Sequence, residues 1–147
     1  MSTPLLDDDA LELDVRDVMT AGVVTVDDDA TLEQAVQTMA EHRIHAVLVV
    51  GTRSGTALGW VTTRGLLGHV GSAPTTRVTD AITEDARAVD PRASVRAAIY
   101  ALGIPGVTRL LVRRRDEREA VGVVTDYDLT VRAIQLSRRP AAPQAAA

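Results

Sequence analysis

The chain contains no cysteine among its 147 residues, which excludes a disulfide framework, a thiolate metal site and a cysteine nucleophile. Aromatic residues make up only 2% of the chain, and phenylalanine is absent. The core must therefore consist of Val, Leu, Ile, Ala and Met side chains. Proteins that bind single-stranded nucleic acid stack its bases on aromatic rings, and their affinity depends on positive charge. Because this chain has few rings and a net charge of −4, we expect no nucleic-acid partner.

Long apolar runs are also missing. No stretch approaches the roughly eighteen residues that a membrane span requires. The N-terminus carries the acidic run Asp7–Asp9 and lacks the basic start and apolar stretch of a signal peptide. We therefore expect a soluble cytoplasmic protein with no membrane partner. The length, with 46% hydrophobic residues, suits one compact domain or two half-size lobes that depend on each other.

An internal repeat is the most informative feature that is present. The segment 15–67 aligns without a gap on the segment 78–130, which lies 63 residues later. Fourteen of the 53 aligned positions are identical, against roughly three to five expected by chance for a chain rich in Ala and Val. The identical pairs are Val15/Val78, Asp17/Asp80, Thr20/Thr83, Val26/Val89, Asp27/Asp90, Ala30/Ala93, Ala35/Ala98, Leu48/Leu111, Val49/Val112, Ala57/Ala120, Gly59/Gly122, Val61/Val124, Thr62/Thr125 and Leu66/Leu129. Such a repeat indicates two copies of one supersecondary unit that bury a shared core.

Each unit predicts the element order β-α-β-β-α, so the fold class is α/β (α+β) with a duplicated motif. A capping box at Thr31–Gln34 begins the first helix, whose buried face is Leu32, Ala35, Val36 and Met39. Apolar runs predict strands over 23–26, 46–50 and 57–61 in the first unit and over 86–89, 109–113 and 120–124 in the second. The other helices are predicted after Thr62, over 94–102 and after Thr125.

These signals divide the chain into four segments. We expect a flexible acidic N-terminus over 1–12, a first motif over 13–70, a second motif over 71–136, and a disordered Pro/Ala tail over 137–147.

The first unit opens with Asp17-Val-Met-Thr20, and the second closes with Gly122-Val-Val-Thr125-Asp-Tyr-Asp128. With the duplication, these motifs make the chain resemble the CBS domain (named for cystathionine β-synthase) over residues 15–134. Two such motifs in tandem form a Bateman module, with two small sheets related by a pseudo-twofold axis. The resemblance implies a stand-alone regulatory module that binds an adenosine-containing nucleotide, such as AMP, ATP or S-adenosylmethionine, between the motifs. It also implies a homodimer formed through the helices.

The closing motif of the second unit has suitable chemistry for a ribose. Thr125 begins the turn from strand to helix, and Asp128 follows about one turn later on the same face. A carboxylate can accept hydrogen bonds from two adjacent hydroxyls, and a helix N-terminus offers N–H groups to a phosphate. The resemblance assigns the ribose hydroxyls to Asp128, an assisting role to Thr125 and the pocket lining to Tyr127. The alternative is that Thr125 is an N-cap and Asp128 a favourable first-turn acid.

In the first unit, Gly65 stands where the ribose carboxylate should be, so we expect one competent site at most. The pseudo-twofold geometry implies that Thr125 and Asp128 face the entry strand of the other motif. The further predicted binding residues are Thr20, Val23, Val24 and Thr25 on that strand, with His45 and Arg109 at the starts of the central strands. The alternatives are a local hydrogen bond for His45 and a surface ion pair for Arg109.

We expect no metal site at His42 and His45, because one ends a helix, the other begins a strand, and no third ligand is near in sequence. No nucleophile–base–orienter set is recognisable, so we expect no catalytic residues, no required cofactor and no enzymatic activity. The rival hypothesis is a ligand-free scaffold for dimerisation or for docking an effector protein. Arg132 is placed to pair with Asp128 four residues earlier, and Trp60 is expected in the core or an interface.

Overall fold

The structure is a computed structural model and describes residues 3–138. The helices are α1 (Asp8–Leu11), α2 (Val15–Val18), α3 (Leu32–His42), α4 (Thr63–Leu66), α5 (Val95–Leu102) and α6 (Ala133–Ser137). The helical turns are η1 (Leu67–His69), η2 (Val78–Ala81) and the π-helical η3 (Asp128–Arg132). The strands are β1 (Thr20–Ala21), β2 (Thr25–Asp27), β3 (Ala46–Val50), β4 (Ala57–Thr62), β5 (Ala88–Val89), β6 (Arg109–Arg113) and β7 (Ala120–Thr125).

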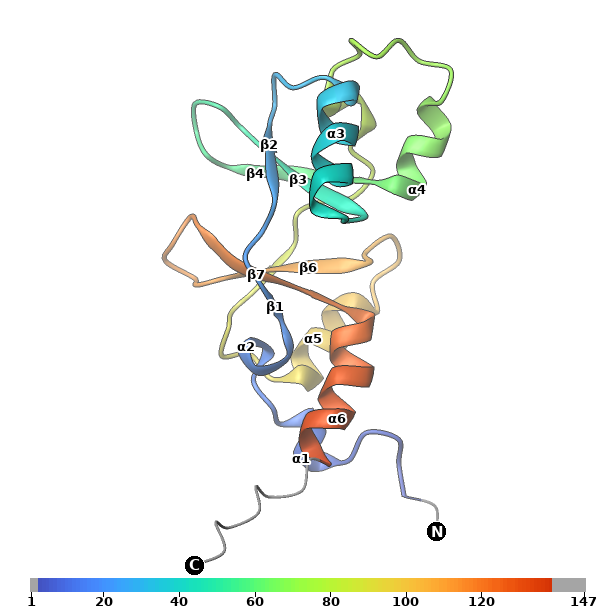
Figure 1. Cartoon of the computed structure of the whole chain (residues 1–147). Coiled ribbons are helices and arrows are strands. Elements are labelled where there is room, and N and C mark those ends of the chain that lie inside the picture. Colours follow the sequence, from blue (N-terminus) through green and yellow to red (C-terminus); the bar gives the residue numbers. More distant parts are fainter. Residues whose placement is uncertain (1–2, 139–147) are drawn as a thin grey trace, which may run out of the picture.

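These elements form two lobes, each built on one small mixed sheet (Figure 1). In the first lobe the strand order is β2-β3-β4, with β2 parallel and β4 antiparallel to β3. In the second lobe the order is β1-β7-β6-β5, with the same parallel and antiparallel pairing around β6. The predicted fold class is confirmed. The strand predicted over 86–89 is shorter than expected and pairs only at Ala88 and Val89.

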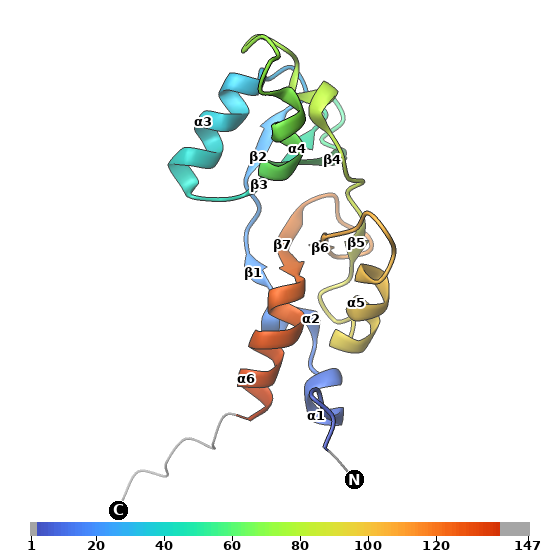
Figure 2. The ribbon, with the colours of Figure 1, turned by 90° about the vertical axis from the view of Figure 1, so that its right-hand side faces the viewer.

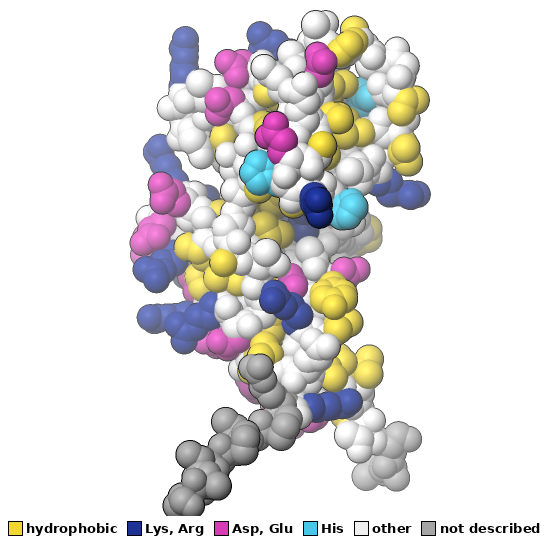
Figure 3. All heavy atoms as spheres, in the orientation of Figure 1, with side chains coloured by type: hydrophobic (Ala, Val, Ile, Leu, Met, Phe, Trp, Pro, Cys, Tyr) yellow, Lys and Arg dark blue, Asp and Glu magenta, His cyan; other side chains and the backbone are white. Residues whose placement is uncertain are grey.

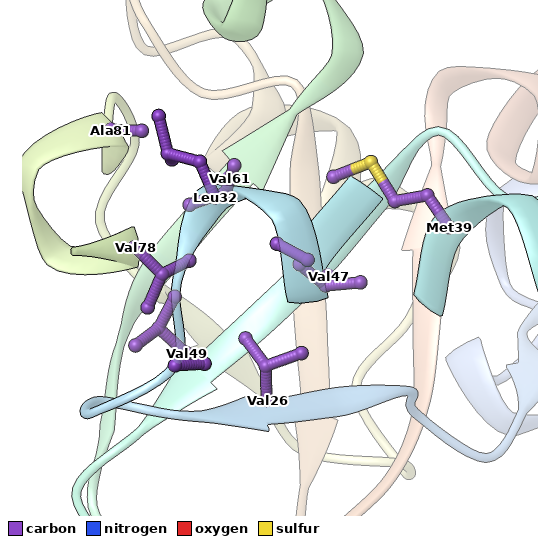
Figure 4. Close-up of a cluster of buried hydrophobic side chains, with 10 residues drawn as sticks. Val26, Leu32, Met39, Val47, Val49, Val61, Val78 and Ala81 are labelled. Carbon is purple, nitrogen blue, oxygen red and sulfur yellow. The ribbon is translucent and has the colours of Figure 1, made fainter. Parts of the chain in front are cut away.

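Helix α3 illustrates how local sequence sets an element. Thr31 Oγ1 accepts the Gln34 N–H at 3.2 Å, and Gln34 Oε1 accepts the Thr31 N–H at 3.0 Å, as the capping box requires. Leu32, Ala35 and Met39 are buried against β3 and β4 (Figure 4). Val36 does not join them and is 49% exposed, because it lies at the edge of the apolar face.

The strand predicted over 23–26 is wrong in one respect, because the chain changes sheets inside it. Thr20 and Ala21 form β1, which pairs antiparallel with β7 at Val123 and Gly122 of the second unit. After Gly22, at φ +82°, the chain crosses to the first lobe, where β2 begins at Thr25. Glycine suits this crossing because it adopts positive φ without a steric penalty.

The two units exchange their entry segments. Val15 and Val18 come from the first unit but are fully buried in the core of the second lobe. The equivalent residues of the second unit, Val78 and Ala81, are fully buried in the core of the first lobe (Figure 4). The connecting segments therefore run between the lobes in both directions (Figure 2). Neither unit has a complete core without the other.

Two repeated glycines allow this exchange. A Cβ at Gly122 would lie 2.5 Å from the carbonyl oxygen of Thr20, and a Cβ at Gly59 would lie 2.8 Å from that of Glu84. Each entry segment thus passes against the last strand of the other unit, too close for any side chain. The identity Gly59/Gly122 therefore marks a contact that the pseudo-twofold axis duplicates.

The two sheets face each other across a third apolar cluster. Leu48 and Trp60 of the first lobe pack there with Leu111 of the second, and each is at most 2% exposed. Trp60 is thus confirmed as an interface residue.

The ends of the described chain differ from the expected segments. Within the segment expected to be flexible, Asp8–Leu11 form α1, capped by Asp7, and Ala10 is 1% exposed beside α6. Ser137, the first residue of the tail predicted over 137–147, belongs to α6. The rest of that predicted tail, 139–147, lies outside the described residues.

The exchange predicts that a change in one unit weakens the other lobe. Val15→Ala should lower the free energy of unfolding by about 1–3 kcal/mol, because it empties part of a packed core. Hydrogen exchange should accelerate in α5 and α6 rather than in α3. The control Leu5→Ala, at a position 69% exposed, should change stability by less than about 0.5 kcal/mol. Faster hydrogen exchange confined to α3 would contradict the exchange of entry segments between the two units.

Candidate functional site

The features predicted for a ligand site lie at one end of the facing sheets. Strands β3 and β6 begin at this end, while β4 and β7 end here and lead into α4 and into the helix containing η3 (Figure 1). The two hairpin turns, 51–56 and 114–119, lie at the opposite end (Figure 1). We call the first end the cleft end and the second the hairpin end.

At the cleft end, Asp128 closes a local hydrogen-bond set. Its Oδ2 accepts the Thr125 N–H at 3.0 Å and the Thr125 hydroxyl at 3.2 Å. The side chain is buried, with the residue 4% exposed. The carboxylate thus bonds to the residue at the start of its own helix, which agrees with the alternative that Asp128 is a first-turn acid. The π-helical turn that begins at Asp128 is a geometry found frequently at functional sites.

Arg132 connects this carboxylate to the exchanged segment. Its Nη1 lies 3.6 Å from Asp128 Oδ1, which is the pair expected four residues apart. The same nitrogen donates to the carbonyls of Val18 and Met19, at 3.2 Å each. The end of α2 is thus tied to the helix that carries Asp128.

The corresponding position of the first unit lies beside an open pocket. Thr62 Oγ1 accepts the Gly65 N–H at 3.0 Å, so this turn is capped by the threonine alone. The pocket measures about 410 Å³ and is rich in hydroxyls and cations. Its lining residues are His45, Thr62, Thr63, Arg64, Gly65, Thr83, Glu84, Gly106, Thr108 and Arg109.

Arg109 lies between this pocket and the Thr125–Asp128 turn. It lines the pocket, and in the sheet it stands directly opposite Thr125 on β7. Its guanidinium carbon lies 5.7 Å from the centre of the Trp60 ring, within the range of a cation–π contact. Burial lowers the pKa of Arg109, while the nearby carboxylates of Glu84 and Asp126 act in the opposite direction. An arginine stays charged under such shifts, so the cleft end keeps a fixed cation.

Glu84 is the functional candidate that the sequence reasoning missed. It is 7% exposed, and its carboxylate accepts the Thr108 hydroxyl at 2.8 Å together with the backbone N–H groups of Thr108 and Arg109. The entry segment of the second unit is thereby fastened to the start of β6. The repeat held one signal for it, since Ala21 is the aligned residue and the acid breaks the similarity of the two units.

The structure does not gather all of the predicted binding residues. His45 and Arg109 share the 410 Å³ pocket, Thr20 lies opposite Val123 in β1, and Tyr127 is 59% exposed. Val24 packs against the core of the first lobe. Val23 and Thr25 line a different pocket, which runs toward the hairpin end. The structure thus places Val23 and Thr25 in a different pocket from the one that His45 and Arg109 line, and their contact with a ligand stays a prediction.

His42 and His45 lie in different environments. His42 Nδ1 lies 2.9 Å from the Thr38 carbonyl oxygen within α3, whereas His45 lines the pocket. Within residues 3–138, no three His, Cys, Asp or Glu side chains converge as metal ligands. No helix in the same range is long and apolar enough to cross a membrane.

Comparison with known proteins identifies the family. The CBS domain model matches residues 15–72, which cover the first unit. Solved CBS-domain structures resemble the whole two-lobed fold, including one from Agrobacterium tumefaciens that is 23% identical over 82% of this chain and 98% of that chain, with a TM-score of 0.68. Residues 15–72 therefore match the CBS-domain family, and the chain as a whole shares the fold of solved CBS-domain structures. None of the curated protein sequences matches it.

Two further solved structures add detail. Hypoxic Response Protein I with two coordinated zinc ions is 29% identical over 80% of this chain and 96% of that chain, with a TM-score of 0.65. The CBS domain of a bacterial CNNM/CorC family Mg²⁺ transporter in complex with ATP is 24% identical over 86% and 89% of the two chains, with a TM-score of 0.72. Proteins that consist only of CBS domains are typically non-catalytic regulatory modules.

The contacts of Glu84 generate a prediction for the site. Glu84→Ala should lower the free energy of unfolding by about 1–3 kcal/mol, because it leaves buried N–H groups without an acceptor. Glu84→Gln keeps one carbonyl oxygen as an acceptor for these N–H groups, so its free energy of unfolding should fall less. Chemical denaturation of both variants measures the difference. Equal stability of Glu84→Ala and the wild type would show that water replaces the carboxylate without cost.

Proposed function

We propose that this chain is a regulatory module that binds an adenosine-containing nucleotide at the cleft end, between two CBS motifs that form a Bateman module. The observation that carries the proposal is the position of Arg109, which lines the cationic pocket and stands opposite Thr125. A phosphate and a ribose of one ligand can thus be recognised by neighbouring groups. The module acts by binding its ligand more tightly in one of two conformations.

The phosphate end of the ligand is recognised by cations. The two cations Arg64 and Arg109 share the 410 Å³ pocket with the His45 imidazole and several threonine hydroxyls. Guanidinium groups form paired, charge-assisted hydrogen bonds with phosphate oxygens. The same pocket contains Glu84, but its carboxylate is already engaged by Thr108 and the backbone of β6.

The ribose end is assigned to Asp128 and Thr125. Oδ2 of Asp128 holds two hydrogen bonds, whereas Oδ1 has the Arg132 guanidinium at 3.6 Å, beyond hydrogen-bond length. This leaves acceptor capacity on Oδ1 for ribose hydroxyls once the 4% exposed side chain is uncovered. Binding is therefore coupled to a local movement of the helix that begins with η3.

The similar structures support the class of ligand. The CNNM/CorC CBS domain was solved in complex with ATP, and the CBS-domain protein CBSX2 in complex with AMP. The latter is 21% identical over 85% of this chain and 98% of that chain, with a TM-score of 0.69. ATP and AMP share an adenosine, and its ribose is the part of the ligand that Asp128 is proposed to bind.

The second candidate function is a ligand-free interaction scaffold that docks an effector protein. One observation favours it, namely that the Asp128 carboxylate is buried and already bonded to Thr125. Gly65, at the equivalent position of the first unit, also favours the scaffold, because it offers no carboxylate to a ribose.

A thermal-shift panel separates the two functions. Wild-type protein is tested with AMP, ADP, ATP, NAD, S-adenosylmethionine and an inosine control. A ligand at a hundred times its Kd adds about 2.7 kcal/mol to the stability, which should raise Tm by about 5–10 °C for a chain of this size. We expect one adenosine ligand to produce this shift.

Variants assign the shift to the cleft end. Asp128→Ala should abolish it through loss of the ribose contact, and Arg109→Met should weaken the phosphate-bearing ligands most. Arg115→Met serves as the control, because Arg115 is exposed in the second hairpin and does not line the pocket. A panel without any shift would favour the scaffold, whereas an equal shift in Asp128→Ala would move the ribose to another residue.

We further propose that two copies pair through their helices. Val36 and Val70, which are 49% and 83% exposed, line a groove between α3 and the segment that follows α4. Leu67, in that same segment, is 66% exposed. Ile99, the equivalent of Val36, and Tyr100 expose apolar surface on α5. Hydrophobic side chains gather over the α4 side of the first lobe (Figure 3). A second copy offers the same two surfaces and can cover both.

Val70→Glu should shift the chain from dimer to monomer, because pairing would bury an unpaired charge. Sedimentation velocity at several concentrations measures the state. The control Leu5→Glu, at a residue 69% exposed in the N-terminal segment, should leave it unchanged. A monomeric wild type at every concentration would rule out the pairing.

A further inference from the structure

A second pocket lies at the hairpin end of the facing sheets, away from the cleft end. It measures about 440 Å³, within the range of about 300–1,000 Å³ that is typical of small-molecule sites. Leu48 and Leu111, one from each lobe, form its buried floor. The remaining apolar lining is Val23, Val50, Ala57 and Ala120.

The repeat explains why the interface is hollow here. Ala57 and Ala120 are an identical pair at the starts of β4 and β7, so small side chains lie on both facing strands. Three residues further along β4, the bulky Trp60 packs in the same apolar cluster as Leu48 and Leu111. The cavity therefore follows from the residues of both units, and a molecule bound in it touches both lobes.

Polar groups are concentrated at the mouth of this pocket. Arg118, in the second hairpin, donates from Nη1 to the Ser54 carbonyl of the first hairpin at 3.0 Å. This bond fixes the guanidinium across the gap and uses one of its five N–H groups. Thr25 and Gly55 complete the rim with Glu119, whose carboxylate disfavours a polyanion such as a nucleotide.

From this arrangement we propose that the hairpin-end pocket binds a small amphipathic carboxylate, with its aliphatic chain between Leu48 and Leu111 and its carboxylate on Arg118. The apolar walls exclude water from the aliphatic chain of the ligand. A guanidinium pairs with a carboxylate through two parallel hydrogen bonds. A single negative charge matches Arg118 beside Glu119. The inference goes beyond the nucleotide function, because it concerns the opposite end of the interface.

Octanoate is the probe, with 1-octanol as the uncharged analogue and acetate as the analogue without a chain. The full chain is titrated by calorimetry and by the fluorescence of Trp60, the single tryptophan, which stands opposite the pocket residue Leu48 in the sheet. We expect saturable binding of octanoate, weaker binding of octanol and none of acetate. Acetate binding as tight as octanoate, or no saturable octanoate binding, would overturn the proposal.

Arg118→Met tests the carboxylate contact without touching the core. Loss of a charge-assisted pair should weaken octanoate about tenfold to a hundredfold and leave octanol unchanged. Arg115→Met is the matched control in the same hairpin and should bind as the wild type does. Equal octanoate affinity in Arg118→Met and Arg115→Met would refute the role of Arg118.

Filling the pocket with a larger side chain tests where the aliphatic chain of octanoate binds. Ala57→Leu and Ala120→Leu each place an isobutyl group in the cavity and should abolish octanoate binding. Asp128→Ala should leave it unchanged, so the result is independent of the nucleotide proposal. Retained binding in both folded leucine variants would overturn the assignment to this pocket. If neither variant folds, the comparison of Arg118→Met with Arg115→Met decides.

Discussion

The reciprocal exchange of entry segments is the constraint on which the rest of the structure depends. Val15 and Val18 complete the core of the second lobe, while Val78 and Ala81 complete that of the first. Each core thus contains residues from both units, and burial of the apolar surface of one lobe requires the chain of the other. This exchange holds the two sheets face to face and creates a cleft end and a hairpin end.

Departures from the repeat decide what each end can bind. Asp128 aligns with Gly65, Glu84 with Ala21, and Trp60 with Val123. These differences change the charge and volume of side chains at aligned positions of the repeat. The carboxylate at 128 is bonded to its own turn, Glu84 locks the start of β6, and Trp60 fills the interface beside Arg109. The retained alanines, Ala57 and Ala120, leave the opposite end hollow.

The two ends also differ in the kind of ligand they suit. The cleft end combines Arg64, Arg109 and His45 with threonine hydroxyls, which is suitable chemistry for phosphate. The hairpin end combines apolar walls with one fixed guanidinium. Since both ends lie between the same pair of sheets, a molecule at either end contacts both lobes. Each ligand can thus change the preference of the module between conformations only through its different affinity for them.

From the sequence by itself, the duplication, the element order and the capping box of α3 could be predicted, because these depend on local patterns of apolar, capping and turn residues. The pairing of Asp128 with Arg132 followed from helical spacing. Tertiary structure alone decided which sheet each strand joined, because a short apolar run such as 20–26 pairs with whichever edge the whole chain presents. It also decided that Val23 and Thr25 line a different pocket from His45 and Arg109, and that Glu84 reaches β6. These contacts join residues distant in sequence, and no local pattern encodes a distance across the pseudo-twofold axis.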